Sequence, residues 1–233
     1  MERLGYYPHE QPTGMDWKVP VLDMCTMGMA PGQLTILAGG SGEGKSMLCA
    51  HIVRAAVAQG GRVALFTMEM GNPEYQSRLV TAVSGVQRRK SKREAENNPY
   101  SPVEARLMDD ATGVIQGWDL HSKSRGGITV GEIAANVKTL DVDKHVDLVV
   151  VDYLQLMGGQ DQDNQAGSLK AITGALKNLA MDVGCHVIAV SQMNRAGRGE
   201  MRGRDSVKLS CLVTDEKFPL PLKEYLMGGA IEN

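Results

Sequence analysis

Short apolar runs alternate with longer amphipathic stretches over most of the chain. The short runs are continuous, which is typical of strands buried on both faces of a parallel sheet. They lie at residues 33–38, 62–67, 148–151 and 186–191, and residues 118–121 predict a further short strand. The pattern therefore predicts an α/β fold in which helices flank a mainly parallel central sheet.

The stretches between these runs carry helix signals at their ends. Asn72 followed by Pro73 predicts an N-cap and a first helical residue. Thr129 and Glu132 form the T-x-x-E pattern of a capping box. Helices are therefore predicted at 47–58, 73–83, within 97–117, from 129 onward and at 168–183.

The length of 233 residues is enough to bury the core of one α/β domain. Residues 1–20 carry scattered prolines among polar residues, so we interpret them as an irregular arm or linker. Residues 21–233 are then the domain. The cysteines show no metal-ligand spacing, and no apolar run or signal-peptide pattern points to a membrane. We expect a soluble cytoplasmic protein, in the host cytoplasm if a phage encodes it.

A glycine-rich stretch between the first predicted strand and helix matches G-x-x-x-x-G-K-[ST], the phosphate-binding P-loop. Its backbone N–H groups would cradle phosphates, Lys45 would reach the β- and γ-phosphates, and Ser46 would hold Mg²⁺. A glycine-rich turn that binds nothing is the alternative, which the flanking strand and helix disfavour. The predicted nucleotide-binding residues are Gly39, Gly40, Ser41, Gly42, Glu43, Gly44, Lys45 and Ser46.

Polar side chains follow three of the predicted strands. Asp152 closes the most apolar run, an arrangement typical of the Walker B acid that serves Mg²⁺. Glu69 follows residues 62–67 and lies where it would polarise a water; a solvated strand-end acid is the alternative. Gln192 ends the last predicted strand and would report a γ-phosphate through a neutral amide.

Positive charge is local, because the net charge is only −2. The basic run at 88–93 is interpreted as a solvated face rather than a nucleic-acid contact. Arg195, Arg198, Arg202 and Arg204 alternate with small residues, which suits contact with a phosphate backbone. A solvated flexible turn is the alternative for that segment.

These motifs together resemble the ATPase domain of the DnaB-type replicative hexameric helicases, including phage members. The resemblance is carried by residues 39–46, 66–70, 152–157 and 187–195. It implies a RecA-like P-loop NTPase fold, ATP and Mg²⁺ as ligands, and a homohexamer with ATP at subunit interfaces. It further implies that Glu69 is the catalytic base and that loops at 158–167 and 195–206 face single-stranded DNA in a central channel.

Two departures from the family pattern matter. The chain lacks the N-terminal helical domain that in the family braces the ring and meets primase. It also stops at Asn233, inside what looks like the start of the last family motif, whose continuation would supply core strands and an arginine finger. We therefore expect this chain to bind nucleotide without rapid hydrolysis.

Three functions fit these patterns. The first is an ATP-dependent DNA helicase motor that translocates on single-stranded DNA during replication, with a primase or helicase loader as further partner. The second is a RecA-like ATPase that uses ATP as a switch for DNA binding or strand exchange without unwinding. The third is a truncated or split product that poisons or completes a ring. Strand displacement on forked DNA separates the first from the others.

Overall fold

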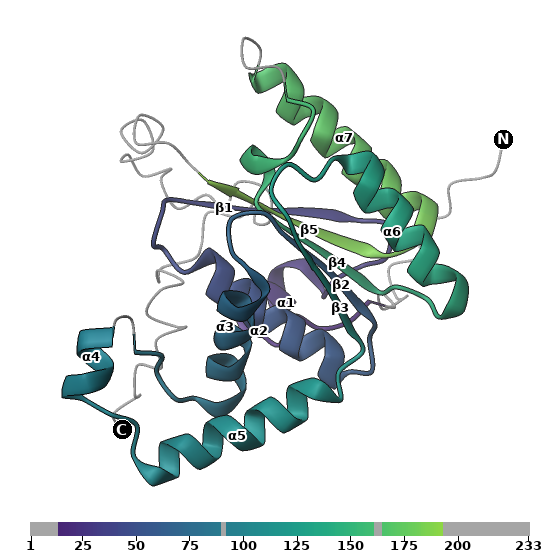
Figure 1. Cartoon of the computed structure of the whole chain (residues 1–233). Coiled ribbons are helices and arrows are strands. Elements are labelled where there is room, and N and C mark those ends of the chain that lie inside the picture. Colours follow the sequence, from purple (N-terminus) through teal and green to yellow (C-terminus); the bar gives the residue numbers. More distant parts are fainter. Residues whose placement is uncertain (1–13, 90–91, 161–164, 193–233) are drawn as a thin grey trace, which may run out of the picture.

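A parallel β-sheet forms the centre of the molecule (Figure 1). The computed structural model describes residues 14–89, 92–160 and 165–192. Within this part, five strands lie in the order β1-β5-β4-β2-β3, and every neighbouring pair is parallel. The strands are β1 (Leu34–Gly39), β2 (Val63–Thr67), β3 (Leu120–Ser124), β4 (Leu148–Asp152) and β5 (His186–Gln192). The predicted α/β class with a mainly parallel sheet is confirmed.

The five predicted helices lie close to their predicted positions, and three further helical segments, at 20–26, 92–97 and 154–156, were not predicted. Together they are α1 (Pro20–Thr26), α2 (Lys45–Ala58), α3 (Asn72–Ser84), α4 (Lys92–Asn97), α5 (Pro102–Gln116), α6 (Val130–Asp143), the 3-10 turn η1 (Leu154–Leu156) and α7 (Gln165–Val183). The capping box of Thr129 and Glu132 is confirmed, and Ser101 with Glu104 forms another at the start of α5.

Two local predictions were wrong in detail. Asn72 is already helical, and its neighbour Gly71 is the N-cap, with extended backbone and no side-chain cap. The short strand predicted at 118–121 is β3, which begins only at Leu120. Trp118 lies before this strand and packs, partly buried, against the hydrophobic core.

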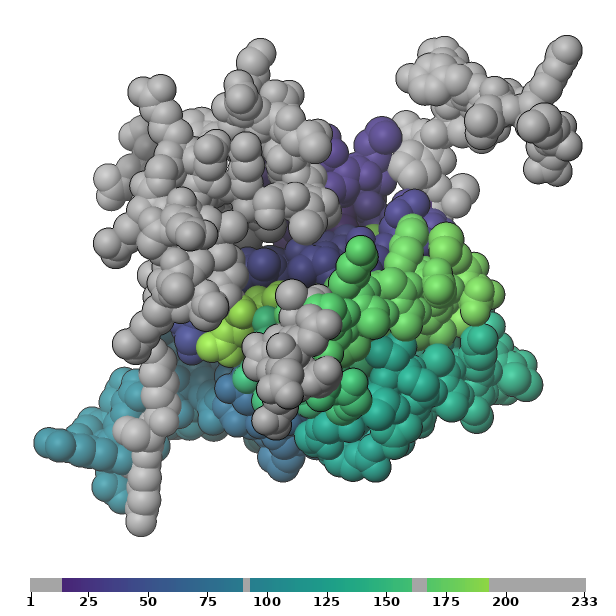
Figure 2. All heavy atoms as spheres, turned by 90° about the horizontal axis from the view of Figure 1, so that it is seen from above, coloured from purple at the N-terminus to yellow at the C-terminus, as the bar shows by residue number. Residues whose placement is uncertain are grey.

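The sheet separates two hydrophobic cores, because successive residues of a strand point to opposite faces. On one face Leu65, Val150 and Ile188 pack with residues of α1, α2, α3 and α5. On the other face Phe66, Val149 and others pack with α6 and α7. Figure 1 shows these two helical layers on either side of the strands, and Figure 2 shows α7 in green beside α6 in teal. None of the described helices has the length and apolar character needed to cross a membrane.

The segment before α1 packs against the first of these cores. The Trp17 ring is 1% exposed, and its Nε1 donates to Thr26 Oγ1 at 2.8 Å. It meets the His186 ring edge to face, with the ring centroids 5.3 Å apart. Val19 is also buried. The described part of the predicted arm therefore lies against the domain core.

A charged network holds together the amino ends of the strands. Arg62, whose side chain is 10% exposed, donates from Nε to the Asp119 carboxylate at 3.0 Å and from Nη2 to Asp143 at 3.2 Å. Its Nη1 donates to the carbonyl oxygens of Leu140 and Lys144. Hydrogen bonds, first from the Lys144 ammonium and then from Arg62, lower the pKa of Asp119 to about 2. The charged side chains of this network are therefore hydrogen-bonded to one another and to main-chain carbonyls.

The basic run at 88–93 contains a structural arginine. The Arg89 guanidinium pairs with Glu104 at 3.1 Å and lies over the Tyr100 ring, 4.5 Å from its centroid. The interpretation of the whole run as a solvated face was therefore wrong for Arg89, whose side chain is only 10% exposed. It was wrong because two partners from the start of α5 bury its planar head.

Candidate functional site

The glycine-rich loop joins the carboxyl end of β1 to the amino end of α2. Gly44 is the N-cap of α2, with φ +89°, and Gly42 has φ +77°. Both conformations lie in the left-handed region, where only glycine is unstrained. Since no side chain caps α2, the loop leaves main-chain N–H groups at the positive end of a helix, which is suited to an anion.

Two side chains of the loop bond to its own backbone. Lys45 Nζ donates to the carbonyl oxygens of Gly39 at 2.8 Å and Gly40 at 2.7 Å. Glu43 Oε2 accepts from the Gly40 N–H at 2.6 Å. The lysine head is therefore held at the mouth of the loop, where phosphate oxygens would replace the two neutral carbonyls as stronger, charged acceptors.

Asp152 lies at the carboxyl end of β4, in the middle of the sheet, and is 2% exposed. Burial raises the pKa of its carboxyl, a hydrogen bond with Ser46 opposes this, and the charge of Glu69 adds to the rise. Its Oδ2 is buried and has no hydrogen-bond partner among the described residues. A buried carboxylate oxygen without a partner is a costly arrangement, which a bound cation would relieve.

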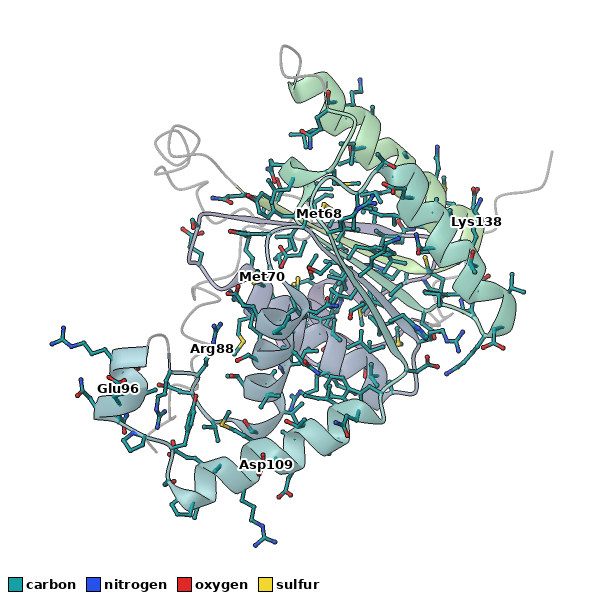
Figure 3. The ribbon with its side chains drawn as sticks, viewed as in Figure 1. Met68, Met70, Arg88, Glu96, Asp109 and Lys138 are labelled. Atoms are coloured by element: carbon teal, nitrogen blue, oxygen red, sulfur yellow. The ribbon has the colours of Figure 1, made fainter. Side chains whose placement is uncertain are left out.

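Glu69 lies between two methionines that are anchored in different cores. Met68 packs in the core beneath α6 and α7, whereas Met70 packs in the core beneath α2 and α3. The carbonyl of Met70 accepts from the hydroxyls of Thr67 at 2.9 Å and Ser124 at 2.7 Å. Met68 and Met70 are labelled in Figure 3, and the Glu69 side chain between them is exposed and lines a pocket with residues of the loop.

One pocket brings the predicted chemistry together. The predicted residues that line it include Lys45, Ser46, Glu69, Asp152 and Gln192, with Ser41, Gly42 and Gly44 of the loop. Gly39, Gly40 and Glu43 are not among its lining residues, and they contact Lys45 or each other. The roles of these residues toward nucleotide and metal stay predictions.

Sequence reasoning missed two lining residues, Arg78 and Tyr153. Arg78 projects from α3, where its Nη2 donates to Glu74 at 3.4 Å. Its Nε is buried without a hydrogen-bond partner among the described residues. The one available signal was a basic residue in the helix that follows Glu69. Tyr153 directly follows Asp152 and was part of a motif without an assigned role.

The residues present fit a Mg²⁺ ion. The Ser46 hydroxyl and the Asp152 carboxylate are hydrogen-bonded to each other, so both are within reach of one cation, and Oδ2 of Asp152 is available. The described residues hold no cluster of three or more His, Cys, Asp or Glu side chains that could bind a metal alone. Mg²⁺ suits such a place, because it keeps waters and substrate phosphates among its ligands.

The residues predicted to contact DNA cannot be placed. Arg195, Arg198, Arg202 and Arg204 lie outside the described residues, as does the middle of the loop at 158–167. The same holds for the stretch that resembles the last family motif, so the arginine-finger prediction stays a prediction.

Solved structures with this fold include the ATPase domain of G40P and a DnaB-like replicative helicase studied with primase. The first has a TM-score of 0.74 and 23% identity, covering 88% of this chain and 72% of that one. The second has a TM-score of 0.73 and 22% identity, covering 91% of this chain and 48% of that one. At these identities the likeness establishes the shared fold, which confirms the RecA-like class expected from the sequence.

Proteins that are similar to this chain in sequence include replicative DNA helicases. The replicative DNA helicases DnaB of Synechocystis sp. and of Leifsonia xyli subsp. xyli are 30% and 31% identical over 186 residues, or 78% of this chain. The matches span 21% and 40% of those two proteins, so the chain corresponds to less than half of each. The family described as DnaB-like helicase C terminal domain matches residues 14–210, and the chain belongs to that family.

Proposed function

We propose that this chain is the motor domain of an ATP-dependent DNA helicase that acts in replication. The observation that carries the proposal is the convergence of Lys45, Ser46, Glu69 and Asp152 on one pocket at the carboxyl end of the sheet. In open α/β sheets ligands bind at this end, and these four residue types are the ones that phosphoryl transfer requires.

The loop and Lys45 grip the phosphates. Main-chain N–H groups at the start of α2 bind the phosphate oxygens, and Lys45 exchanges the carbonyls of Gly39 and Gly40 for them. Ser46 and Asp152 would hold Mg²⁺. When bound, this ion neutralises charge that develops on the transferred phosphoryl group.

Three further side chains act on the γ-phosphate. Glu69 accepts a proton from the attacking water, for which its exposed carboxylate is placed opposite the loop. Arg78 supplies positive charge from α3, and its unpartnered Nε leaves it a donor for a phosphate oxygen. Gln192 donates from its amide and so distinguishes the triphosphate state from the diphosphate state.

The partners belong to the same proposal. The arginines at 195, 198, 202 and 204 contact single-stranded DNA in the channel of a homohexamer, with ATP at subunit interfaces. One DnaB-like helicase of the same fold was studied for its interactions with primase, and we propose primase or a helicase loader as a partner here. The site of action is the cytoplasm.

Strand displacement on forked DNA tests the proposal. Because we expect this chain to hydrolyse ATP slowly, separation of the strands with ATP and Mg²⁺ should also be slow. Glu69→Gln should abolish it while nucleotide binding persists, because only the base is removed. Glu96→Gln is the matched control, since Glu96 lies on α4 away from the pocket (Figure 3). Nucleotide-dependent DNA binding without any displacement would instead favour an ATP switch. A chain that binds neither nucleotide nor DNA would overturn both functions.

A further inference from the structure

The side chain of Gln155 bridges η1 and the end of β5. Its Nε2 donates to Ser191 Oγ and to the carbonyl oxygen of Gln192, each at 2.9 Å. Its Oε1 accepts from the Gln192 N–H at 3.1 Å. One carboxamide therefore satisfies both main-chain groups of a single residue that is far away in sequence.

The bridge takes the place of a strand neighbour. β4 and β5 pair only from Leu148 with His186 to Val151 with Ala189, because the chain then turns into η1. β5 runs on to Gln192, whose other edge pairs with Gly39 of β1. A carboxamide presents a donor and an acceptor as a peptide group does, so Gln155 completes the hydrogen bonding that β4 no longer provides.

The turn that carries Gln155 is firmly placed. Leu154 and Met157, on either side of it, are buried in the core beneath α6 and α7. Met157 N donates to the Leu154 carbonyl at 3.1 Å, which closes the turn. The Gln155 amide therefore belongs to a buried turn only a few residues after Asp152, and its hydrogen bonds join this turn to Gln192.

Gln192 lines the pocket and Gln155 does not. Any influence of Gln155 on a bound nucleotide must therefore pass through the residues that it contacts. Gln192 lies between Gly39, the first residue of the glycine-rich loop, and the Gln155 amide. Hydrogen bonds on both sides fix the Gln192 main chain and so narrow the directions that its side chain can take, which favours recognition of a single phosphate.

We propose that Gln155 is a positioning residue that aims Gln192 at the terminal phosphate and so sets the preference of the site for nucleoside triphosphate over diphosphate. This inference rests on the proposed nucleotide-binding function. Without the bridge, the end of β5 keeps its pairing with β1 but loses its second support. The Gln192 amide then samples other directions, and the γ-phosphate contact weakens while the grip on the β-phosphate stays.

The test is the ratio of two dissociation constants, one for ADP and one for a non-hydrolysable ATP analogue, both with Mg²⁺. Gln192→Ala should lower the preference for the analogue about tenfold, the size of one hydrogen bond to a charged group. Gln155→Ala should lower it about fivefold or more, with ADP affinity unchanged. Gln160→Ala is the matched control, because the Gln160 amide also bonds to this turn, at Leu154 and Met157.

A double-mutant cycle separates positioning from general damage. If Gln155 acts through Gln192, the double variant should show the ratio of Gln192→Ala alone. An equal loss of ADP and analogue affinity, or an effect that adds in full to that of Gln192→Ala, would overturn the inference. Where Gln155→Ala does not fold, Gln155→Glu serves, since it keeps the acceptor for the Gln192 N–H and loses both donated bonds.

The outcomes distinguish this inference from the function beneath it. A wild-type chain that binds no triphosphate removes the proposed function and the inference together. A wild-type chain that prefers the analogue, beside a Gln155→Ala variant with the same preference, removes the inference alone. The inference also fails if Gln192→Ala keeps the preference for the analogue over ADP, because the residue through which Gln155 acts would then make no difference.

Discussion

The two ends of the parallel sheet treat polar groups in opposite ways. At the amino end, Arg62 reaches two carboxylates and two carbonyls, and the pKa of Asp119 falls to about 2. At the carboxyl end, Asp152 Oδ2 and Arg78 Nε are buried without partners among the described residues, and the pKa of Asp152 is raised. The polar side chains at the amino ends of the strands are therefore hydrogen-bonded, whereas two buried polar atoms at the carboxyl ends have no partner among the described residues.

The difference separates stability from function. Buried polar groups are nearly always hydrogen-bonded, and each exception asks for an explanation. At the amino end the side chains satisfy one another, and this network helps to hold the fold together. At the carboxyl end the missing partners are of the kind that phosphates and a divalent cation supply. Variants at each end should therefore have separable effects.

The largest effect is expected at the amino end. Arg62→Ala should lower the free energy of unfolding by about 3 kcal/mol, because it removes at once the bonds of a buried guanidinium to two carboxylates and two main-chain carbonyls. Thermal melting should shift downward by roughly 6–12 °C for a domain of this size. Nucleotide affinity, measured below the melting range, should not change. An unchanged melting temperature would contradict the structural role of this network.

The next effect is expected at the carboxyl end and should appear in binding only. Lys45→Ala should weaken ATP binding about 100-fold, the loss of charge-assisted hydrogen bonds to phosphate, with little change in melting. Lys177→Ala is a close control. Lys177 Nζ donates to Gly32 O and Gln33 Oε1 near the start of β1, much as Lys45 does at its end. Titration with a fluorescent nucleotide measures the affinity of both variants. An equal loss of affinity in the two would contradict the role assigned to Lys45.

A smaller effect of opposite sign is expected at Asp152. Asp152→Asn should stabilise the nucleotide-free protein by about 1 kcal/mol at neutral pH, as replacements of strained functional groups commonly do. The sign follows from burial, which raises the folded-state pKa, so that the ionised carboxylate opposes folding once the pH exceeds its unfolded value. Mg²⁺ should no longer tighten nucleotide binding. Calorimetric melting with and without Mg²⁺ measures both, and a lower melting temperature without ligand would contradict the argument.

The smallest effect concerns acid stability. The folded-state pKa of Asp119 is about 2 and its ordinary value is 3.8, so its contribution is present above pH 4 and is lost between pH 4 and pH 2. We expect a loss of about 1 kcal/mol there, discounted because Lys144 is half exposed. Glu132, whose pKa is also lowered to about 2, loses its contribution in a similar window. The free energy of unfolding of Asp119→Asn, measured with urea, should therefore fall less between pH 4 and pH 2 than that of the wild type. An equal fall in the two proteins would exclude Asp119 as a cause.

Much of the carboxyl end could be predicted from the sequence, because its signals are local. Asp152 follows a continuous apolar run, and the glycine-rich loop has fixed spacing. The fold class followed from the same runs. Arg78 has only the weak signal of a basic residue in the helix after Glu69, because its place in the pocket depends on how α3 packs beside the loop.

Long-range contacts explain the remaining failures. Gln155 bonds to Gln192 across a change of direction in the chain that no periodic pattern encodes. Trp17 lies in a stretch with scattered prolines and polar residues and no periodic apolar pattern, so nothing local indicated its burial against His186. Arg89 was read as part of a charged run, although Glu104 and Tyr100 bury it.

The anchoring of Met68 and Met70 in opposite layers has a consequence for remote substitutions. Glu69, the proposed general base, lies between Met68 and Met70, which pack in different cores. A small shift of one helical layer relative to the other would therefore change the direction of its carboxylate. Cavity-forming changes deep beneath α6 or beneath α2 should then slow turnover while the molecule is still folded. Hydrolysis in this chain would therefore report the alignment of the two helical layers.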